Sequence, residues 1–289
     1  MKVIVFGAGE YGKKYIDQAG NDIQILAVAD NYLHGKMVRG HKIISLEEIQ
    51  EYDYDKIIIC LNDYTNLAAF EAMDSIINQL HGIGVSDECI ELQNIYYAKD
   101  DSRVLFLKEY SESVKNFREG AVAECGVMRG HFAHYISKYF NTRTFYMFDT
   151  FSGFDERDIR QEPNREIQDF LRTKGNLLVK NGNEKIALRR CMNKENIIIR
   201  KGVVPDTFCG LENERFIFVN LDMDIYAPTI AALCWFSERM VKGGVILCHD
   251  YLDPRYPGIK DAVDEFSLNH KFIKIYLPSA GSVAIIMQE

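Results

Sequence analysis

The sequence predicts an α/β protein made of two units, a small α/β unit followed by a doubly wound, mostly parallel sheet with a reversed edge strand. Three observations predict this fold. A short apolar run leads into a glycine-rich turn and a helix at residues 2–15, and the same order recurs at 120–136. Apolar strands and helices then alternate, and two apolar runs joined by a short turn close the chain. At 289 residues the chain is long for one domain, and we place the units at 1–98 and 99–289.

The composition indicates a folded protein. Hydrophobic residues make up 47% of the chain, which is enough for sizeable cores. The formal charge is −8 and the 34 basic residues form no cluster, which argues against a nucleic-acid partner. No apolar run is long enough to span a membrane, and the opening segment has the pattern of a strand instead of a signal peptide. The seven cysteines include no CxxC pair, so we expect reduced thiols and a cytoplasmic location.

The first glycine-rich turn has the spacing of a nucleotide-binding loop. Gly7, Gly9 and Gly12 follow the strand "KVIVF", and the next strand, "IQILAVAD", ends on Asp30. In a Rossmann-like unit, glycines let a phosphate approach the backbone at a helix N-terminus, and the acid binds ribose hydroxyls. The unit is too short for both halves of a dinucleotide site, so a mononucleotide, a sugar nucleotide or a purely structural role is as consistent as NAD. Through "GAGEYGKK", "VADN" and "DYDKIIICL" it resembles the small N-terminal domain of bacterial sugar acyltransferases and other glycan-assembly proteins.

The second unit opens with a looser loop. In "GAVAECGVMRGHFAHYI" an apolar strand runs to Glu124, and Gly126 and Gly130 flank a turn in which Met128 stands where a middle glycine would be. The following strand, "TFYMFD", ends on Asp149, at the spacing from the loop at which an acid reaches ribose hydroxyls. This order predicts a second nucleotide-type loop.

Further strands and helices complete the second sheet. The strands are "NIIIRKG", "RFIFVNLD" and "GGVILCHD", the helices are "APTIAALCWFSERM" and "GIKDAVDEF", and "KFIKIYLP" and "SVAIIMQE" form the closing antiparallel pair. In such sheets the ligand lies beyond the carboxyl ends of the strands. Burying charged groups without partners is costly, so we expect the polar residues that end these strands to line one binding edge. They are Glu124, Asp149, Asp222, His249 and Asp250.

Five pieces of the second unit match one family in order and spacing: "AECGVMRG", "FDTFSGF", "KGVVPDTF", "LDMDIYAPTIAAL" and "KGGVILCHDY...GIKDAVDEF". Through them, residues 104–289 resemble the macrocin O-methyltransferase (TylF-like) family, which methylates sugar hydroxyls with S-adenosylmethionine. The resemblance implies a class I methyltransferase fold. It also implies a magnesium-type site near the transferred methyl group.

The resemblance assigns cofactor binding to residues at the ends of two predicted strands, "AVAE" and "TFYMFD". Gly126 and Gly130 fall in the loop near the methionine part of the cofactor, and Asp149 falls on the ribose-binding acid. Glu124 would orient that loop or meet the cofactor's amino group, or it simply caps a helix start. Phe151 is as consistent with the core as with an adenosine site. The residues assigned to the cofactor are Glu124, Gly126, Gly130, Asp149, Thr150 and Phe151.

The resemblance also implies a cation site, with one departure. Asp222 and Asp250 match metal ligands of the family, but His249 stands where the family usually has a second aspartate. Either Asp222 and Asp250 hold Mg²⁺ or Mn²⁺ with His249 as a base or partner, or the cation is absent and His249 deprotonates the acceptor directly. Asp222 or His249 would be the catalytic base. Asp224 and Tyr226 fit the family pattern, or serve only to cap and pack the next helix.

The sequence therefore favours an S-adenosylmethionine-dependent O-methyltransferase acting on a sugar hydroxyl, in an activated or glycan-linked sugar of polysaccharide biosynthesis. The alternatives are an NAD-dependent oxidoreductase acting on a sugar nucleotide and a non-catalytic nucleotide-binding scaffold. The polar segment 154–176 is either a lid over the substrate or a solvated surface helix. The first unit would recruit a nucleotide-bearing substrate or hold a homo-oligomer together.

Overall fold

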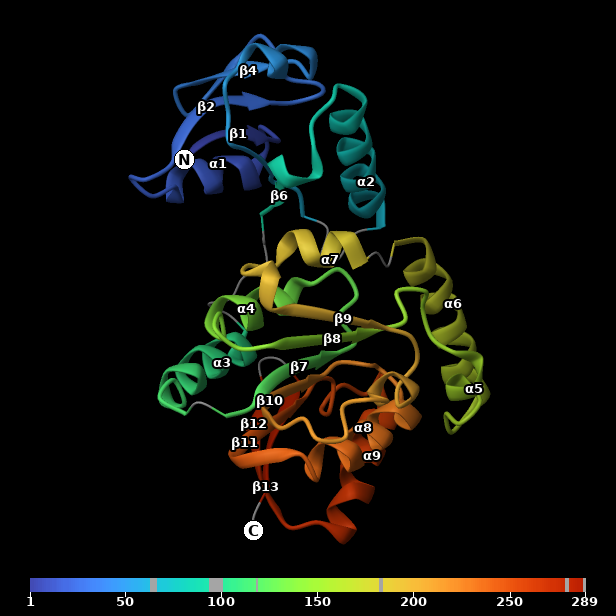
Figure 1. Ribbon diagram of the computed structural model, residues 1–289. Coiled ribbons are helices and arrows are strands. Elements are labelled where there is room, and N and C mark those ends of the chain that lie inside the picture. The colour runs from blue at the N-terminus through green and yellow to red at the C-terminus, as the bar shows by residue number, and fades with distance from the viewer. Residues whose placement is uncertain (63–66, 94–100, 118, 182–183, 279–280, 288–289) are drawn as a thin grey trace. The chain divides into compact units, whose positions relative to one another are not determined.

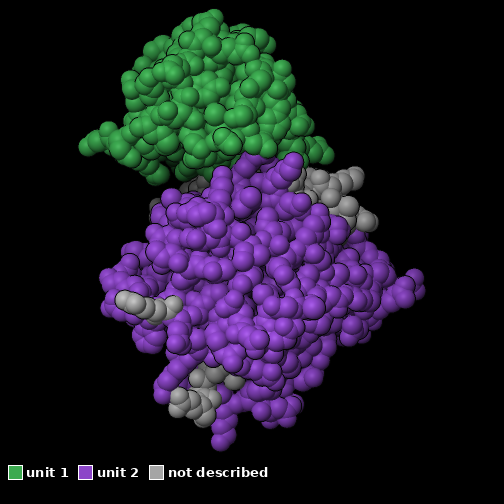
Figure 2. Space-filling model, in the orientation of Figure 1, with its two compact units in different colours: residues 1–96 green, residues 97–289 purple. Residues whose placement is uncertain are grey.

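The computed structural model divides into two compact units, Met1–Tyr96 and Tyr97–Glu289 (Figures 1 and 2). Each unit contains one sheet, and the two sheets share no strand. Within the part of the chain that the structure describes, no helix is both long enough and apolar enough to cross a membrane. The structure describes all residues except 63–66, 94–100, 118, 182–183, 279–280 and 288–289.

The first unit is a six-stranded sheet in the order β3-β4-β2-β1-β5-β6. All described pairs are parallel except β3 with β4. The central strand β1 is buried over its last four residues, and the apolar residues of α1 pack against the core that contains it. The elements are β1 Lys2–Phe6, α1 Glu10–Gln18, β2 Gln24–Ala29, β3 Met37–Val38, β4 His41–Ile44, β5 Lys56–Ile59, α2 Leu67–Gly82 and β6 Ile90–Leu92.

The second unit is a seven-stranded sheet in the order β12-β13-β11-β10-β7-β8-β9. Five neighbouring strands, from β11 to β9, run parallel, and β13 runs antiparallel to both of its neighbours. The reversed strand is thus β13, and β12 pairs outside it at the edge. The strands are β7 Ala121–Cys125, β8 Phe145–Asp149, β9 Ile197–Lys201, β10 Phe216–Leu221, β11 Met240–Cys248, β12 Phe272–Leu277 and β13 Ser282–Met287.

Helices cover both faces of this sheet. Figure 1 shows α3 and α4 on one side and α8 and α9 on the other. The strand order reverses between β7 and β10, and this change of direction sends the following helices to opposite faces. The helices are α3 Ser102–Ser113, α4 His131–Tyr139, α5 Glu156–Ile159, α6 Arg165–Asn181, α7 Glu184–Arg190, α8 Tyr226–Ser237 and α9 Pro257–Asn269.

The core lies around the central strands β7 and β10, which are buried along their whole length. Coverage on both faces explains why these strands are continuous apolar runs instead of alternating ones. Aromatic rings fill the side of α8, where Trp235 stacks on Phe208 with ring centroids 4.4 Å apart. A doubly wound sheet with this switch point opens its ligand site at the carboxyl ends of β7 and β10.

The structure adds elements that the sequence did not predict. The helix α3 begins at Ser102, where no element was predicted. The polar segment 154–176, for which a lid or a solvated surface helix was expected, contains α5 and most of α6. Strand β11 begins at Met240, three residues before the predicted start of "GGVILCHD", and ends at Cys248. His249 and Asp250 therefore lie just beyond the strand, at the ligand edge.

Candidate active site

Close backbone contacts shape the loop between β7 and α4. Gly126 has a φ of 87°, and a Cβ there would lie 1.8 Å from the carbonyl oxygen of Asp222. Gly130 has a φ of 79°, and a Cβ there would lie 2.8 Å from Cα of Ala187 in α7. A side chain at either position would have to displace backbone, so packing and φ both require glycine. The predicted cofactor loop is thus fixed against the turn that follows β10.

Asp149 holds this loop from the end of β8. Its Oδ2 accepts a hydrogen bond from the Met128 amide at 2.7 Å, and its Oδ1 accepts one from the Phe151 amide at 2.6 Å. Both donors have a φ of 50°, which is unfavourable for residues with a side chain. Burial raises the pKa of Asp149, although the backbone amides oppose the rise. A carboxylate offers about four lone-pair sites, so two bound amides leave capacity for ribose hydroxyls.

The next two residues belong to a tight turn. The Thr150 hydroxyl donates to the Gly153 carbonyl at 2.5 Å and accepts from the Ser152 amide at 3.2 Å. Phe151 is buried, which fits a place in the packed interior. Their contact with adenosine stays a prediction.

Glu124 is buried beneath the loop. It lies opposite Asn220 in the register of β7 and β10, and Asn220 Nδ2 donates to Glu124 Oε1 at 3.0 Å. Within the described residues, Glu124 Oε2 and Asn220 Oδ1 have no hydrogen-bond partner. Burial raises the pKa of Glu124 well above its ordinary value, and the nearby Asp222 raises it further. Glu124 does not cap α4, whose N-cap, Gly130, receives no side-chain hydrogen bond.

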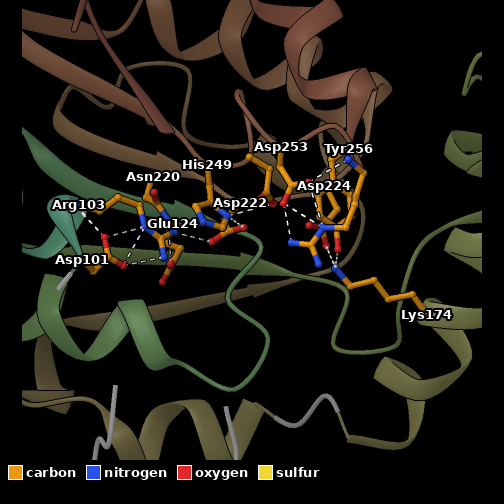
Figure 3. Close-up of polar contacts among 12 residues, drawn as sticks. Asp101, Arg103, Glu124, Lys174, Asn220, Asp222, Asp224, His249, Asp253 and Tyr256 are labelled. Atoms are coloured by element: carbon orange, nitrogen blue, oxygen red, sulfur yellow. Dashed lines mark hydrogen bonds and ion pairs between the residues drawn. The ribbon is translucent and has the colours of Figure 1, made fainter. Parts of the chain in front are cut away.

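The strand ends of β10 and β11 bring together Asp222, His249 and Asp250 (Figure 3 shows the first two). His249 Nδ1 lies 3.0 Å from Asp222 Oδ1 and 3.0 Å from Asp250 Oδ2. One ligand atom from each of the three residues lies within 4.8 Å of the others. Burial alone would lower the pKa of His249, but Asp222 and hydrogen bonds to both aspartates raise it to about 9. Burial opposes ionisation of Asp222, yet His249 and Arg103 hold its pKa well below the usual range.

Arg103 completes this cluster and was missed by the sequence analysis. It is 3% exposed, its Nη1 donates to Asp222 Oδ2 at 3.1 Å, and its Nη2 donates to Asp101 Oδ2 at 3.1 Å. Asp101 also caps α3 by accepting the Arg103 amide at 2.7 Å. The guanidinium lies over the Phe132 ring, 4.9 Å from its centroid. Charges of opposite sign therefore alternate from Asp101 through Arg103 to Asp222 (Figure 3). The only signal in the sequence was an Asp-x-Arg pair at a helix start.

Asp224 forms a second polar contact on the other side of Asp222 (Figure 3). It has a φ of 66°, and its Oδ2 accepts from Lys174 Nζ at 2.8 Å. The same ammonium donates to the Tyr256 hydroxyl at 2.7 Å. Burial raises the pKa of Asp224 to about 7, with Asp222 and Asp250 adding to the rise and Lys174 opposing it. The sequence left Asp224 as a family residue or a helix cap.

The start of α8 uses a different residue as its acceptor. Its N-cap is Ile225, which forms no side-chain cap, so Asp224 does not cap this helix. Instead Glu162, from the segment before α6, accepts the Tyr226 amide at 2.6 Å. The Tyr226 hydroxyl donates to Glu265 of α9 at 2.6 Å, so its ring packs between helices. The packing alternative for Tyr226 fits these contacts.

The glycine loop of the first unit repeats the geometry of the second. A Cβ on Gly12 would lie 1.8 Å from the Gly7 carbonyl oxygen, whereas a Cβ on Gly9 would meet nothing within 4 Å. Asp30 Oδ2 accepts the Ala8 amide at 2.9 Å, as Asp149 accepts Met128. Oδ1 of Asp30 accepts two amides of the following turn. These contacts explain the fingerprint without a ligand and leave Gly9 open to one.

The fold and the strand-end site define a class I methyltransferase: a doubly wound sheet with a reversed strand, a glycine loop after its first strand, and an acid at the end of the next. Residues 96–278 match the family described as macrocin-O-methyltransferase (TylF), and the chain belongs to that family. It is an S-adenosylmethionine-dependent O-methyltransferase. Residues 1–90 match a separate family described as C2185-like, N-terminal. No curated protein sequence matches the chain.

Several solved structures are similar to this chain. The O-methyltransferase NovP is 22% identical, with a TM-score of 0.51 over 65% of this chain and 80% of its own. The calicheamicin methyltransferase CalS11 is 17% identical, with a TM-score of 0.44 over 78% of this chain and 87% of its own. An O-methyltransferase from Bacillus cereus, solved with S-adenosylhomocysteine, is 14% identical, with a TM-score of 0.40 over 76% of this chain and 90% of its own. The similarity to NovP establishes the fold alone.

Proposed function

We propose that the chain methylates a hydroxyl group of a sugar, in a nucleotide-activated or glycan-linked form that belongs to polysaccharide biosynthesis. The observation that carries the proposal is the direct contact between the two halves of the site. Gly126 of the cofactor loop lies against the Asp222 backbone, and Asp222 is the centre of the polar cluster. A methyl donor held by the loop would therefore face an acceptor held by the cluster.

The cofactor would be held by the residues that the family resemblance assigns. Asp149 keeps lone pairs for two ribose hydroxyls, and the loop from Gly126 to Gly130 presents backbone to the methionine part. Glu124 Oε2, buried and without a partner among the described residues, is an acceptor suited to the cofactor's amino group. S-adenosylmethionine supplies the methyl group and leaves as S-adenosylhomocysteine.

The protein's part in the reaction is alignment and proton removal. The acceptor oxygen forms a bond to the methyl carbon as the bond from that carbon to sulfur breaks, and the hydroxyl proton passes to a base. Asp222 and His249 are the bases that the sequence suggested, and neighbours hold both in place: Asp222 accepts from Arg103 and contacts His249, and His249 lies between two carboxylates. We assign proton removal to one of these two residues and orientation of the acceptor to the other.

The donor set fits a divalent cation. Asp222 and Asp250 offer the carboxylate oxygens that Mg²⁺ and Mn²⁺ prefer, and His249 supplies an imidazole, which favours Mn²⁺ over Mg²⁺. A bound cation would lower the pKa of the acceptor hydroxyl and fix its direction. The competing arrangement has no cation, with His249 Nδ1 bridging the two aspartates at 3.0 Å.

The first unit would bring a nucleotide-bearing substrate to the second or join copies of the chain. Its open Gly9 at the start of α1 and its acid at Asp30 support a nucleotide as the ligand. Titration calorimetry with S-adenosylhomocysteine, NAD and UDP-glucose, on the full chain, separates these roles. Binding of NAD alone would revive the oxidoreductase alternative, and binding of neither nucleotide ligand would leave the first unit as a scaffold.

One experiment tests the activity directly. The protein is incubated with S-adenosylmethionine, Mn²⁺ and a panel of UDP-, GDP- and dTDP-linked hexoses, and each sugar is examined by mass spectrometry for the gain of one methyl group. We expect a methylated product from at least one member. Cofactor binding without any methylated nucleotide sugar would overturn the activated-sugar proposal and leave glycan-linked acceptors to be tested in the same way.

A further inference from the structure

The helix α6 carries a cation into the candidate active site. Lys174 donates to Asp224 Oδ2 at 2.8 Å and to the Tyr256 hydroxyl at 2.7 Å, and its side chain is 28% exposed. Figure 3 shows this side chain reaching from α6 to Asp224 and Tyr256. The sequence left residues 154–176 as either a lid or a solvated helix. The contact at Lys174 shows that one face of α6 meets a strand-end carboxylate, while Arg165 and Phe170 of the same helix are exposed.

The segment is fastened at further points close to the same turn. Leu171 precedes Lys174 by three residues in α6. Its side chain is fully buried against Ile159 and Ile225. Ile225 directly follows Asp224 in the chain. Glu162 accepts the Tyr226 amide at 2.6 Å, two residues beyond Asp224. The segment before and within α6 is therefore tied to residues 222–226 by an apolar contact, a backbone cap and an ion pair.

The ion pair with Lys174 stabilises the Asp224 carboxylate, whose backbone conformation and neighbouring charges are both unfavourable. Asp224 has a left-handed φ of 66°, and Asp222 and Asp250 repel its charge. Lys174 supplies opposite charge, and Tyr256 limits where the ammonium can lie, since its hydroxyl accepts from the same nitrogen.

We propose that Lys174 is a positioning residue for methyl transfer, which holds Asp224 and with it the turn that carries Asp222. The inference rests on the proposed function, in which Asp222 and His249 face the acceptor hydroxyl. The ammonium keeps its own protons throughout. As the oxygen–methyl bond forms and the methyl–sulfur bond breaks, the hydroxyl proton passes to Asp222 or His249, so the positive charge lost from sulfur is taken up by that base.

The first test compares Lys174→Met with Lys174→Arg in the full chain, using the nucleotide sugar that the wild type methylates fastest. Arg165→Met is the matched control, because Arg165 lies on the same helix with a side chain that is 92% exposed. Misplacing a reacting group by about 1 Å costs roughly 10²-fold in rate, so we expect kcat of Lys174→Met to fall by about that factor. Lys174→Arg should recover part of the loss, and Arg165→Met should match the wild type. The affinity for S-adenosylhomocysteine should stay unchanged in all three variants, since the described hydrogen bonds of Lys174 go to Asp224 and Tyr256 and not to the cofactor loop.

A double substitution separates this role from a merely structural one. If Lys174 acts through Asp224, adding Lys174→Met to Asp224→Asn should cause no further loss of kcat. An equal loss in both backgrounds, or a wild-type kcat for Lys174→Met, would overturn the inference.

Hydrogen exchange provides a readout that needs no acceptor. Peptides covering residues 222–229 should exchange faster in Lys174→Met than in the wild type or in Arg165→Met. Unchanged exchange would overturn the inference even where methyl transfer is intact. Failure of the wild type to methylate any acceptor would instead contradict the proposed function, and the exchange result would still decide whether Lys174 holds the turn.

Discussion

Replacing Asp149 with alanine should weaken cofactor binding far more than it weakens folding. In the structure this carboxylate accepts the amides of Met128 and Phe151 at 2.7 and 2.6 Å. Both residues have a φ of 50°, a conformation that costs about 1–2 kcal/mol for a residue with a side chain. Asp149 therefore keeps two unfavourable backbone conformations in place, one within the cofactor loop at Met128 and one in the turn after β8 at Phe151. Without it the loop is free to relax before any ligand arrives.

The magnitude follows from the bonds that are lost. A hydrogen bond to a charged group contributes about 1.5–3 kcal/mol, and the two ribose hydroxyls would both bind Asp149. Desolvation of the carboxylate offsets part of this, so we expect a net loss of about 3 kcal/mol, or roughly two orders of magnitude in Kd. The free energy of unfolding should fall by only about 1 kcal/mol, because Asp149 and Met128 are partly exposed and water can solvate the Met128 amide once it is released.

Titration calorimetry with S-adenosylhomocysteine measures the first quantity, and urea unfolding measures the second. The first unit offers a matched control in Asp30→Ala, which removes an acid that accepts the Ala8 amide at 2.9 Å from the same place in the fold. That variant should bind S-adenosylhomocysteine like the wild type. A well-folded Asp149→Ala protein with unchanged affinity would refute the assignment of Asp149 to the ribose.

Four further outcomes are expected. Burial raises the pKa of Glu124, so the stability that its protonation provides is present below the pKa of the unfolded state and is lost as the pH rises through the folded pKa. Urea unfolding should therefore show Glu124→Gln to be at least as stable as the wild type at pH 8. The advantage of the variant should shrink toward pH 4. Methyl transfer should fall after treatment with EDTA and return with Mn²⁺ or Mg²⁺, and Asp250→Asn should lose most of it; full activity after exhaustive chelation would decide for the cation-free arrangement. Gly12→Ala should destabilise the first unit by several kcal/mol because its Cβ would lie 1.8 Å from a carbonyl oxygen, whereas Gly9→Ala, with nothing within 4 Å, should leave the melting temperature within about 2 °C of the wild type. A fragment of residues 97–289 should still bind S-adenosylhomocysteine, and a folded fragment that does not would show that the units share the cofactor site.

The sequence predicted the ligand edge because parallel strands all end on the same side of a sheet. The alternation of strands and helices was enough to bring Asp222 and His249 together from strands that end 27 residues apart. It could not find Arg103 or Lys174, which reach Asp222 and Asp224 across 119 and 50 residues. Helical periodicity indicates which face of a helix is apolar, but not which charged side chain bends toward a distant strand end.

Met128 shows a second limit of the sequence. Its place in the loop departs from the usual glycine spacing, and the sequence alone offers no reason why a side chain is tolerated there. In the structure its φ of 50° coincides with an amide hydrogen bond to Asp149, which compensates for the unfavourable backbone. The sequence showed that Met128 replaces a glycine, but not that Asp149, 21 residues later, accepts its amide hydrogen bond.

The placement of α5 and α6 between β8 and β9 bears on how acceptor preference can change between relatives. This insertion meets the second sheet through a few side chains near Asp224, whereas the next helix, α7, lies against Gly130 so closely that a Cβ would come within 2.8 Å of Ala187. Under the proposed function, an exchange of residues 154–181 for the corresponding stretch of another family member would change side chains near the acceptor and leave the close approach of α7 to Gly130 in place. An exchange that also carried α7 would alter that approach and with it the donor loop. Acceptor preference is therefore expected to change by substitutions before α7, without changes to the cofactor loop.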